Sequence, residues 1–566
     1  MNVKTMKFTN FSSKKKHDLK ITVIGGTTDV QKNMYVYEYG NDIVIVDCGI
    51  GFPGRDAFGV DLILPDFSYV LQNIGKVRGL IITHGHEDHF GAVPYLLKEV
   101  RIPIYCAKIV SEFLKNRLKE QNLLEGTSFN IINPDGGPIS LGEFKIDYFR
   151  VNHSVPESLG FCIGTPQGTI FHVPDYKFDW TPMMDKQFDI PRAVRLSQGG
   201  VLAMLSDCLG ATSEGFTHSE KEIQKTFNEY ISQAKGQVFV TTMSSNISRI
   251  KMVVDASVSC GRKVVIGGRS MEQSTETARR LGYMPHPKES FVPLHHAQAM
   301  DQSKLTYIVA GCYGQSGSAL GRIARDEHKY IKMRAGATVI FSADPIPGTV
   351  DLVNELIDKL TLAGAEVIYS AVQENLHVSG HGSQGDHVLL ASLIRPKYYL
   401  PIGGTISLMR AYSNNIVRLG ILQENILELL EGDSVTFSQG TAFKHKEIET
   451  HDVYIGSQVD IVSPVVIKDR RVLSEDGIFV AILKFDREKN EFLDSAQIVS
   501  RGFVYMKESK ELIAGAEKAI LDAVKQNRKK KNDWALIKDE VEKALFKYFQ
   551  KTTGRTPLLL PVIVEA

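Results

Sequence analysis

The residues best suited to chemistry are crowded into Thr83–Phe90, where the sequence reads THGHEDHF. Three imidazoles and the Asp88 carboxylate follow the apolar run 79–82, which is typical of a buried strand. His84 and His86 are two apart, so they point to the same side of an extended segment, while Asp88 and His89 can face a second point in space. Nitrogen and oxygen donors at this density favour a Zn²⁺ site, with Mn²⁺ a weaker candidate.

Further candidate ligands stand at the ends of later predicted strands. His153 follows the predicted strand 144–151, and Asp175 follows the predicted strand 168–171. Single residues of this kind are usually structural. Their order after the histidine-rich stretch raises their weight as ligands.

The sequence HGHEDH resembles the HxHxDH motif of the metallo-β-lactamase superfamily. The resemblance implies two metal sites that share one carboxylate. The implied ligands are His84, His86 and His153 for the first ion, Asp88 and His89 for the second, and Asp175 for both. Asp47, at the end of a predicted hairpin over 34–39 and 42–47, would steady the metal loop without touching an ion. His172 would be a supporting or packing residue.

Later motifs narrow the resemblance to the ribonuclease J family of β-CASP nucleases. Strands and helices alternate from about residue 221 to 365, which indicates an inserted α/β domain with a parallel sheet. The motifs that carry the likeness are Ser206–Cys208, Ser213–Glu220, Ser245–Ile247, Gly268–Met271, Pro345–Gly348, Leu376–Ser383, Ser500–Val504 and Thr553–Pro557. The likeness runs from about residue 19 to the C-terminus.

The stretch Leu376–Ser383 holds two histidines around a Ser-Gly turn, with a helix predicted from about Gln384. Such a turn exposes backbone N–H groups, and a helix N-terminus favours an anion. The resemblance implies that this turn binds a substrate phosphate. The implied substrate-binding residues are His377, Val378, Ser379, Gly380 and His381, with Asn246 and Arg269 as further contacts to the RNA backbone or 5′ end. By the same resemblance, Asp207 is the proton donor and His381 the proton acceptor.

The expected architecture is α/β, with a metallo-β-lactamase αββα sandwich, an inserted β-CASP α/β domain and a small α/β C-terminal domain. The expected divisions are a flexible tail (1–18), the metallo-β-lactamase domain (19–220 and 366–452), the β-CASP domain (221–365), a linker (453–469) and the C-terminal domain (470–566). In the last domain, strand signals run through 472–485, helices are predicted over 508–526 and 534–550, and a final strand over 558–564.

The resemblance implies a metal-dependent ribonuclease that acts 5′→3′ on 5′-monophosphorylated single-stranded RNA. Endonuclease cleavage and roles in RNA decay and rRNA processing are also implied. The RNA would run between the metal domain and the inserted domain, where a narrow channel favours single strands. The implied cofactor is Zn²⁺, for which Mn²⁺ or Mg²⁺ can substitute, and the implied assembly is a homodimer or homotetramer.

The sequence departs from the family pattern at the second metal site. Gly403 stands where members usually carry a histidine that binds the second ion, and glycine offers no side-chain donor. Val173–Pro174 and Cys208–Gly210 also replace the usual residues. These departures predict one firm metal site and a second, weaker one.

Composition is that of a large protein with buried cores. The chain has 566 residues, of which 43% are hydrophobic, and a formal net charge of +1, so any anion-binding surface must be local. Basic runs occur at Lys14–Lys16 and Arg528–Lys531, where solvated segments are the simplest interpretation. Six widely spaced cysteines include no CxxC pair, and no apolar run approaches membrane-spanning length. We therefore expect a soluble cytoplasmic protein with reduced cysteines and no membrane contact.

Two other classes of function stay open. HGHEDH also suits a metallo-hydrolase that acts on small molecules, although the inserted domain and the sequence HVSGH argue against one. Gly403 makes a catalytically weakened or inactive RNA-binding scaffold plausible.

Overall fold

The computed structural model divides into two compact units. The larger holds the residues up to Phe52 and Ile63–Val453, and the smaller holds Pro53–Leu62 and Tyr454–Ala566. The described residues are 17–54, 57–345, 349–456, 461–504, 509–527 and 533–565. Outside them lie both basic runs, most of the predicted tail 1–18, and residues 346–348 of the Pro-Ile-Pro-Gly motif. Among the described helices, none combines the length and apolar character that a membrane span requires.

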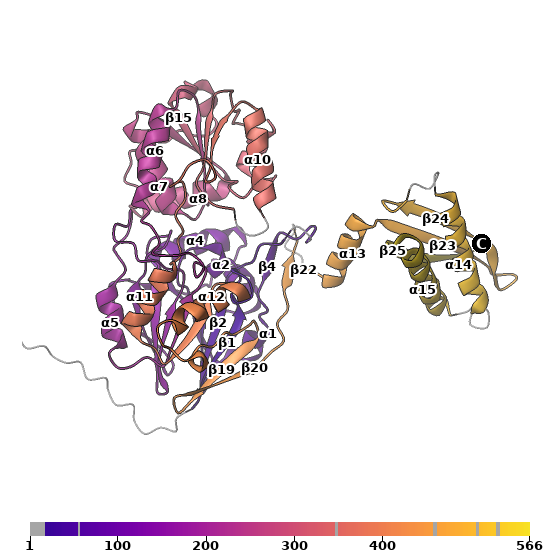
Figure 1. The fold of residues 1–566 in the computed structure, drawn as a ribbon, viewed down its shortest axis with the longest axis horizontal. Helices are drawn as coiled ribbons and strands as arrows, with labels where there is room; N and C mark the ends of the chain where they lie inside the picture. Colours follow the sequence, from indigo (N-terminus) through magenta and orange to yellow (C-terminus); the bar gives the residue numbers. More distant parts are fainter. Residues whose placement is uncertain are drawn as a thin grey trace, which may run out of the picture. The chain divides into compact units, whose positions relative to one another are not determined.

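An eight-stranded sheet with buried central strands begins the larger unit (Figure 1). Across the sheet, the strands are β20 (Thr441–Lys446), β19 (Asp433–Ser438), β1 (Leu19–Gly25), β2 (Met34–Tyr39), β3 (Asp42–Val46), β5 (Val77–Ile81), β6 (Ile104–Ala107) and β7 (Phe129–Ile132). Gly40, at a φ of 60°, and Asn41 close the predicted β2–β3 hairpin. β3 and β5 run parallel, so Asp47 and Thr83 leave the same edge of the sheet.

The second sheet of this unit has six strands. They are β18 (Tyr398–Ile402), β12 (Ala203–Asp207), β11 (Gly168–Val173), β10 (Leu159–Thr165), β9 (Phe144–Arg150) and β8 (Ile139–Leu141). β11, β12 and β18 run parallel. Asp175, Asp207 and Gly403, which lie at or just beyond their carboxyl ends, therefore come to one edge although they are far apart in the sequence.

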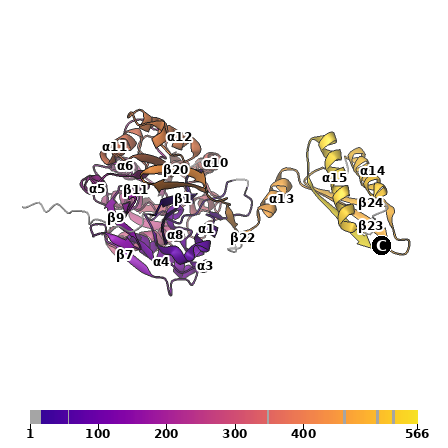
Figure 2. The same cartoon turned by 90° about the horizontal axis from the view of Figure 1, so that it is seen from below.

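Helices cover the outer faces of both sheets (Figure 2). The elements are α1 (Ser68–Gln72), α2 (Glu87–Phe90), α3 (Val93–Glu99), α4 (Lys108–Glu120), α5 (Ile190–Ser197), α11 (Gln384–Ile394) and α12 (Ile406–Val417), with the short strand β4 (Leu62–Leu64). α5, α11 and α12 share a core with the six-stranded sheet, and α4 packs on β6 and β7. The predicted two-sheet sandwich is thereby present.

The segment between β12 and α11 forms a separate layer structure around five parallel strands. The strands are β14 (Lys263–Gly267), β15 (Leu305–Val309), β13 (Val238–Thr241), β16 (Thr338–Phe341) and β17 (Glu366–Ile368). The helices are α6 (Lys221–Gln233), α7 (Ile247–Ser259), α8 (Arg269–Arg280), α9 (Ala319–Ala324) and α10 (Val350–Leu362). α8 packs on α4, where Asn116 Nδ2 donates to Thr277 Oγ1 at 3.3 Å. The inserted parallel α/β domain is as predicted.

The second unit centres on a three-stranded sheet ordered β24-β23-β25. Its elements, with the short strands that precede them, are β21 (Val453–Ile455), β22 (Ile461–Val462), α13 (Pro464–Glu475), β23 (Ile478–Asp486), β24 (Glu491–Arg501), α14 (Lys510–Gln526), α15 (Trp534–Thr553) and β25 (Leu558–Glu565). α14 and α15 share one apolar core with the sheet. The domain boundaries proposed from the sequence remain predictions.

The strand signals expected within 472–485 are confirmed from Ile478, where β23 begins, while residues 472–475 belong to α13. Ser463 caps that helix by accepting the Val465 N–H, and Pro464 occupies its first turn, so the helix is well specified at its start. The strand begins only at Ile478, after Gly477 turns the chain at a φ of 75°.

Candidate metal centre

The histidine-rich loop starts from a buried clamp between two parallel strands. Asp47 follows β3 in the left-handed region, at a φ of 62°. Its carboxylate accepts the Thr83 backbone N–H and the Thr83 hydroxyl, each at 2.8 Å. α2 then begins at Glu87, so His89 lies on its single turn. Hydrogen bonds within the protein thus hold the start of this loop in place without an ion.

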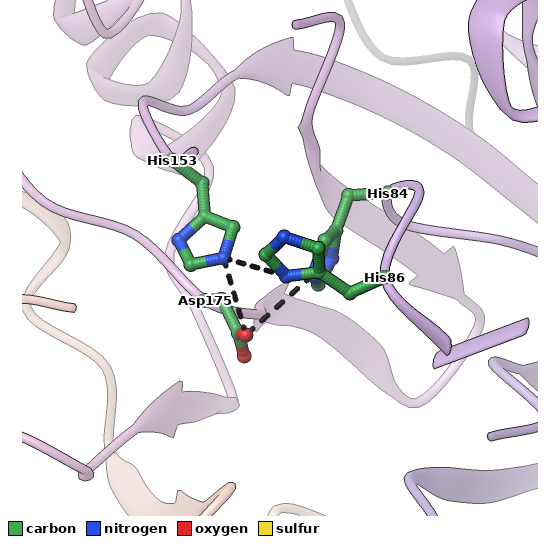
Figure 3. A group of neighbouring side chains, drawn as sticks. All are labelled: His84, His86, His153 and Asp175. Atoms are coloured by element: carbon green, nitrogen blue, oxygen red, sulfur yellow. Dashed lines mark hydrogen bonds and ion pairs between the residues drawn. The ribbon is translucent and has the colours of Figure 1, made fainter. Parts of the chain in front are cut away.

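Four side chains from three separate segments form the first cage (Figure 3). The members are His84, His86, His153 and Asp175. His86 Nδ1 lies 3.3 Å from His84 Nε2 and 3.0 Å from His153 Nε2. Asp175 Oδ2 lies 3.5 Å from His84 Nε2 and 3.6 Å from His153 Nε2. Bonds of the length usual for Zn²⁺ give a tetrahedron with edges of about 3.3–3.5 Å, so these separations fit one ion.

The second ring nitrogen of each histidine has its own hydrogen-bond acceptor. His84 Nδ1 lies 3.0 Å from Thr83 Oγ1, whose proton goes to Asp47. His86 Nε2 lies 2.9 Å from Ser154 Oγ, and His153 Nδ1 lies 2.8 Å from the Gly380 carbonyl oxygen. If these outer nitrogens carry the ring protons and donate, each of the three inner nitrogens keeps a lone pair. The three lone pairs then point toward one another with no proton between them. Such a donor set fits a cation.

The pKa shifts of the residues in this cage also favour a bound cation. Burial lowers the pKa of His84 and His86 well below the usual range, and it lowers the pKa of His153 to about 4. The rings are therefore neutral at pH 7, which is the form that binds metal. Burial would raise the pKa of Asp175, but His89 and His381 hold it well below its usual value, so this carboxylate is ionised.

A second group of possible ligands shares Asp175 but has one donor fewer. His89 Nε2 lies 3.4 Å from Asp175 Oδ1 and 3.6 Å from Asp88 Oδ2. His89 Nδ1 lies 2.7 Å from Asp47 Oδ2, which leaves Nε2 to face the group. Burial raises the pKa of Asp88 to about 6. Three donors are therefore present where the first cage has four.

Gly403 lies next to Asp207 and offers no side-chain donor. It follows β18 at a φ of 68°, and its N–H donates to the Gly26 carbonyl oxygen at 2.7 Å. A Cβ built at this position meets only Asp207 Oδ1, at 3.5 Å. A Cβ would therefore fit, but the backbone conformation disfavours any residue except glycine.

Asp207 and His381 form a hydrogen-bonded pair at the rim of the first cage. His381 Nδ1 lies 2.8 Å from Asp207 Oδ2, and its Nε2 lies 3.9 Å from Asp175 Oδ2. Burial lowers the pKa of His381, but the Asp207 and Asp175 carboxylates outweigh it and raise the value to about 9. The resemblance implied proton transfer by these two residues, and the structure places them together.

The turn before α11 is tied to the cage through glycine. The Gly380 carbonyl binds His153, and a Cβ at this position would lie 2.6 Å from the His153 ring. Only glycine fits so close a contact. Ser379 Oγ accepts the His381 N–H at 3.0 Å, and Ser379 is exposed. Val378 is buried, so it can act only through its backbone.

Asp386 and Thr217 hold this turn by hydrogen bonds, and sequence reasoning missed both. Asp386 Oδ2 accepts the N–H groups of Thr217 and Ser383, each at 2.9 Å. Thr217 Oγ1 donates to the His381 carbonyl oxygen at 2.8 Å. The spacing Ser383–Asp386 resembles a capping box and could have signalled that part. The contact from Thr217 has no local signal, because the two segments lie far apart in the sequence.

Three other sequence candidates lie in different environments. Asn246 is buried, and its side chain accepts the Arg249 N–H as the cap of α7, so little of it is left for RNA. Arg269 is exposed at the start of α8, where it can reach a ligand. His172 is buried against Tyr37, with its Nδ1 2.8 Å from the Tyr37 hydroxyl, in keeping with a packing residue.

Family models match three parts of the chain. The metallo-beta-lactamase superfamily model matches residues 27–178, and the model of the ribonuclease J beta-CASP domain matches residues 235–360. The model of the ribonuclease J C-terminal domain matches residues 465–566. The matches follow the order of the structural layers described above.

Relatives match along nearly the whole length. Ribonuclease J 1 of Streptococcus pyogenes is 35% identical over 98% of each chain. Ribonuclease J2 of Bacillus subtilis is 32% identical over 98% of this chain and 99% of its own. Ribonuclease J of Helicobacter pylori is 34% identical over 95% of this chain and 78% of its own. A solved protein of unknown function from Enterococcus faecalis V583 shares the fold at a TM-score of 0.51, with 13% identity over 74% of this chain and all of its own.

Proposed function

Because this chain belongs to the ribonuclease J family of metal-dependent ribonucleases, we propose that it degrades single-stranded RNA 5′→3′ from a 5′-monophosphate end. We further propose that it cuts RNA internally and serves RNA decay and rRNA processing in the cytoplasm. The observation that carries the proposal is the first cage, where three imidazole nitrogens and one carboxylate converge beside the Asp207–His381 pair.

The proposed chemistry assigns one task to each group around that cage. When bound, a Zn²⁺ ion acts as a Lewis acid toward a phosphate oxygen and lowers the pKa of a water to near neutrality. Asp207 fixes the His381 ring through Nδ1, which leaves Nε2 to exchange a proton with the substrate. We assign Asp207 and His381 as the proton-transfer pair on this basis, with the direction of transfer to be measured.

Substrate binding is proposed at the turn before α11. The N–H groups of this turn and the His377 and His381 rings would hold one phosphate without reading base identity. Arg269, exposed at the inserted domain, is the proposed contact for the 5′ end or the RNA backbone, and Asn246 contributes mainly by capping α7. Because these contacts are to phosphates, the proposed enzyme has little sequence preference.

The space between the metal loop and the inserted domain supports a single-stranded substrate. A small cavity of about 40 Å³ is lined by Gly85 and Glu87 of the metal domain and by Ser245 and Ser270 of the inserted domain. It adjoins a larger cavity of about 600 Å³, and both are lined by Asn116 and Gln273. We propose that RNA enters this space as a single strand.

The proposed metal content is one firmly held Zn²⁺ in the first cage and a weaker ion at Asp88, His89 and Asp175. Manganese or magnesium would substitute more readily at the weaker position, because its ligands include two carboxylates. Gly403 is the reason for the difference, since it contributes no donor.

A second candidate function follows from the same glycine. If both ions are needed for turnover, the chain is a weakened or inactive relative that binds RNA as a scaffold. The complete first cage and the intact Asp207–His381 pair favour turnover.

Self-association is proposed through the second unit. Its sheet packs Phe479, Ala481 and Leu483 against α14 and α15. The alternate positions Val480 and Ile482 are only half-buried, and Val499, Leu560 and Val564 are 37–47% exposed. An apolar sheet face of this kind is typical of an interface between protein chains. It supports the proposal of a homodimer or homotetramer.

The test is cleavage of end-labelled RNA by protein of measured metal content. Oligomers that differ only in a 5′-monophosphate, 5′-triphosphate or 5′-hydroxyl would be compared, with His84→Ala as the inactive control. Release of mononucleotides, fastest from the 5′-monophosphate, is the expected result. Binding without cleavage in Zn²⁺, Mn²⁺ and Mg²⁺ would support the scaffold instead.

A further inference from the structure

A group of buried charges lies at the junction of the inserted domain and the metal domain. Arg249, on α7, is completely buried, and its Nη2 donates to both carboxylate oxygens of Glu220 at 3.3 and 3.1 Å. Lys177 Nζ lies 3.6 Å from Glu220 and 3.8 Å from Asp179, and both of these residues are buried as well. Two cations and two carboxylates balance, which is the condition for keeping charges out of water.

The other arm of the Arg249 guanidinium reaches the phosphate-binding turn. Its Nη1 donates to the Ser342 carbonyl oxygen at 3.0 Å and to Ser342 Oγ at 2.7 Å, just beyond β16. The same nitrogen lies 3.3 Å from the Leu376 carbonyl oxygen and 3.5 Å from His377 Nδ1. Ser342 Oγ in turn donates to the Leu376 carbonyl oxygen at 2.6 Å. One side chain thus links α7, β16, the start of α6 and the turn.

This contact favours one tautomer of His377. A guanidinium has only donors, so His377 Nδ1, at 3.5 Å from Arg249 Nη1, is placed to accept. Burial, followed by the charge of Arg249, lowers the pKa of His377 to about 4, so the ring is neutral at pH 7. The remaining proton is then on Nε2, where it can be donated to a phosphate oxygen.

We propose that Arg249 is a positioning residue for RNA binding, which holds His377 as a neutral Nε2–H donor and fixes the turn against the inserted domain. The inference rests on the proposed function and adds to it the residue that prepares His377. Lysine cannot replace arginine here, because an ammonium lacks the planar fork that reaches Glu220, Ser342 and Leu376 together.

The experiment measures binding of a non-cleavable, 5′-monophosphorylated phosphorothioate RNA by fluorescence anisotropy, in full-length protein. Arg249→Lys should raise the dissociation constant about tenfold or more, because charge-assisted hydrogen bonds are lost, while zinc content stays unchanged. Ser342→Ala, a milder change that is expected to fold, should raise it about threefold in the same direction.

Arg262→Lys is the matched control. Arg262 is another buried arginine of the inserted domain, but it donates only to backbone carbonyls, those of Gly236, Leu305 and Ala234. Its replacement should lower the melting temperature without changing RNA affinity per folded molecule. Equal losses of affinity in Arg249→Lys and Arg262→Lys would show that only stability is involved and would overturn the inference.

A double-mutant cycle tests the route through His377. In a His377→Ala background, Arg249→Lys should have little further effect on affinity, because the group that it prepares is gone. An undiminished effect in that background would contradict the inference. Failure of the wild type to cleave RNA would refute the proposed activity separately, since the phosphorothioate measurement needs no turnover.

Discussion

The two metal-ligand groups share Asp175 yet differ in completeness. The first has four donors, and each of its three imidazoles has an acceptor on its outer nitrogen. The second has three donors, and the resemblance expects a fourth at the position that Gly403 occupies. A site is specified by its donors together with the neighbours that set their protonation, so the first group should hold its ion far more firmly.

The largest expected effect comes from the first cage. His84→Ala removes a ligand whose Nε2 lies 3.3 Å from His86 Nδ1 and 3.5 Å from Asp175 Oδ2. We expect loss of the tightly held ion and RNA cleavage below about one hundredth of wild type, since even changes behind a ligand cost 10–100-fold. Metal analysis by mass spectrometry and the end-labelled RNA assay measure both. Retention of full metal content would place the ion elsewhere.

The next largest expected effect distinguishes the second ligand group from the first. Asp47→Asn replaces the acceptor of the His89 Nδ1 proton with a group that can donate instead, so His89 Nε2 loses its free lone pair. We expect the weaker ion to bind about 10–100-fold less tightly, with a smaller change at the first cage. Titration with Mn²⁺, followed by electron paramagnetic resonance, reports the weaker position. A larger loss of zinc than of manganese affinity would reverse the proposed roles of the two groups.

The counterpart in the first cage is Ser154, whose Oγ lies 2.9 Å from His86 Nε2. Ser154→Ala removes that acceptor and frees His86 to adopt the other tautomer. Zinc affinity should fall about tenfold, measured by competition with a chelator, while manganese binding at the weaker position stays unchanged. If Ser154→Ala and Asp47→Asn have the same effect on both ions, the two groups are not independent.

The smallest expected effect is a gain. Gly403→His adds an imidazole to the side with three donors and should tighten the weaker ion. The left-handed backbone at this position, with a φ of 68°, should lower the free energy of unfolding by about 1 kcal/mol. Gly403→Ala is the control, since it carries the same strain without a donor. Equal ion affinity in the two variants would mean that the imidazole does not reach the ion.

Local sequence predicted the parts of the site that lie close together in the chain. His84, His86, Asp88 and His89 stand within one loop, and the strand before them was readable from its apolar run. His153 and Asp175 were placed from the order of strand ends, and the structure brings both to the loop. This works because β9 and β11 are each antiparallel to β10 and so run in the same direction, which brings the residues after both strands to one edge of the sheet.

The supporting contacts could not be predicted in the same way. Ser154, Thr217 and Arg249 act through partners that are distant in sequence, and neither residue type nor spacing signals them. Asn246 is a motif residue expected to meet RNA, and its side chain also caps α7; its contact with RNA stays a prediction. The helix α13 was not predicted: it begins within the range expected to be a linker, 453–469, and ends within the range that holds strand signals.

Zinc stoichiometry tests the central claim most directly. Metal-free protein would be titrated with Zn²⁺ by isothermal calorimetry, and the bound metal counted by mass spectrometry after dialysis. The account predicts one ion per chain that survives dialysis and a second that binds at least about tenfold more weakly. Two ions of equal affinity, both retained, would contradict it and would require a further ligand in place of the residue that Gly403 lacks.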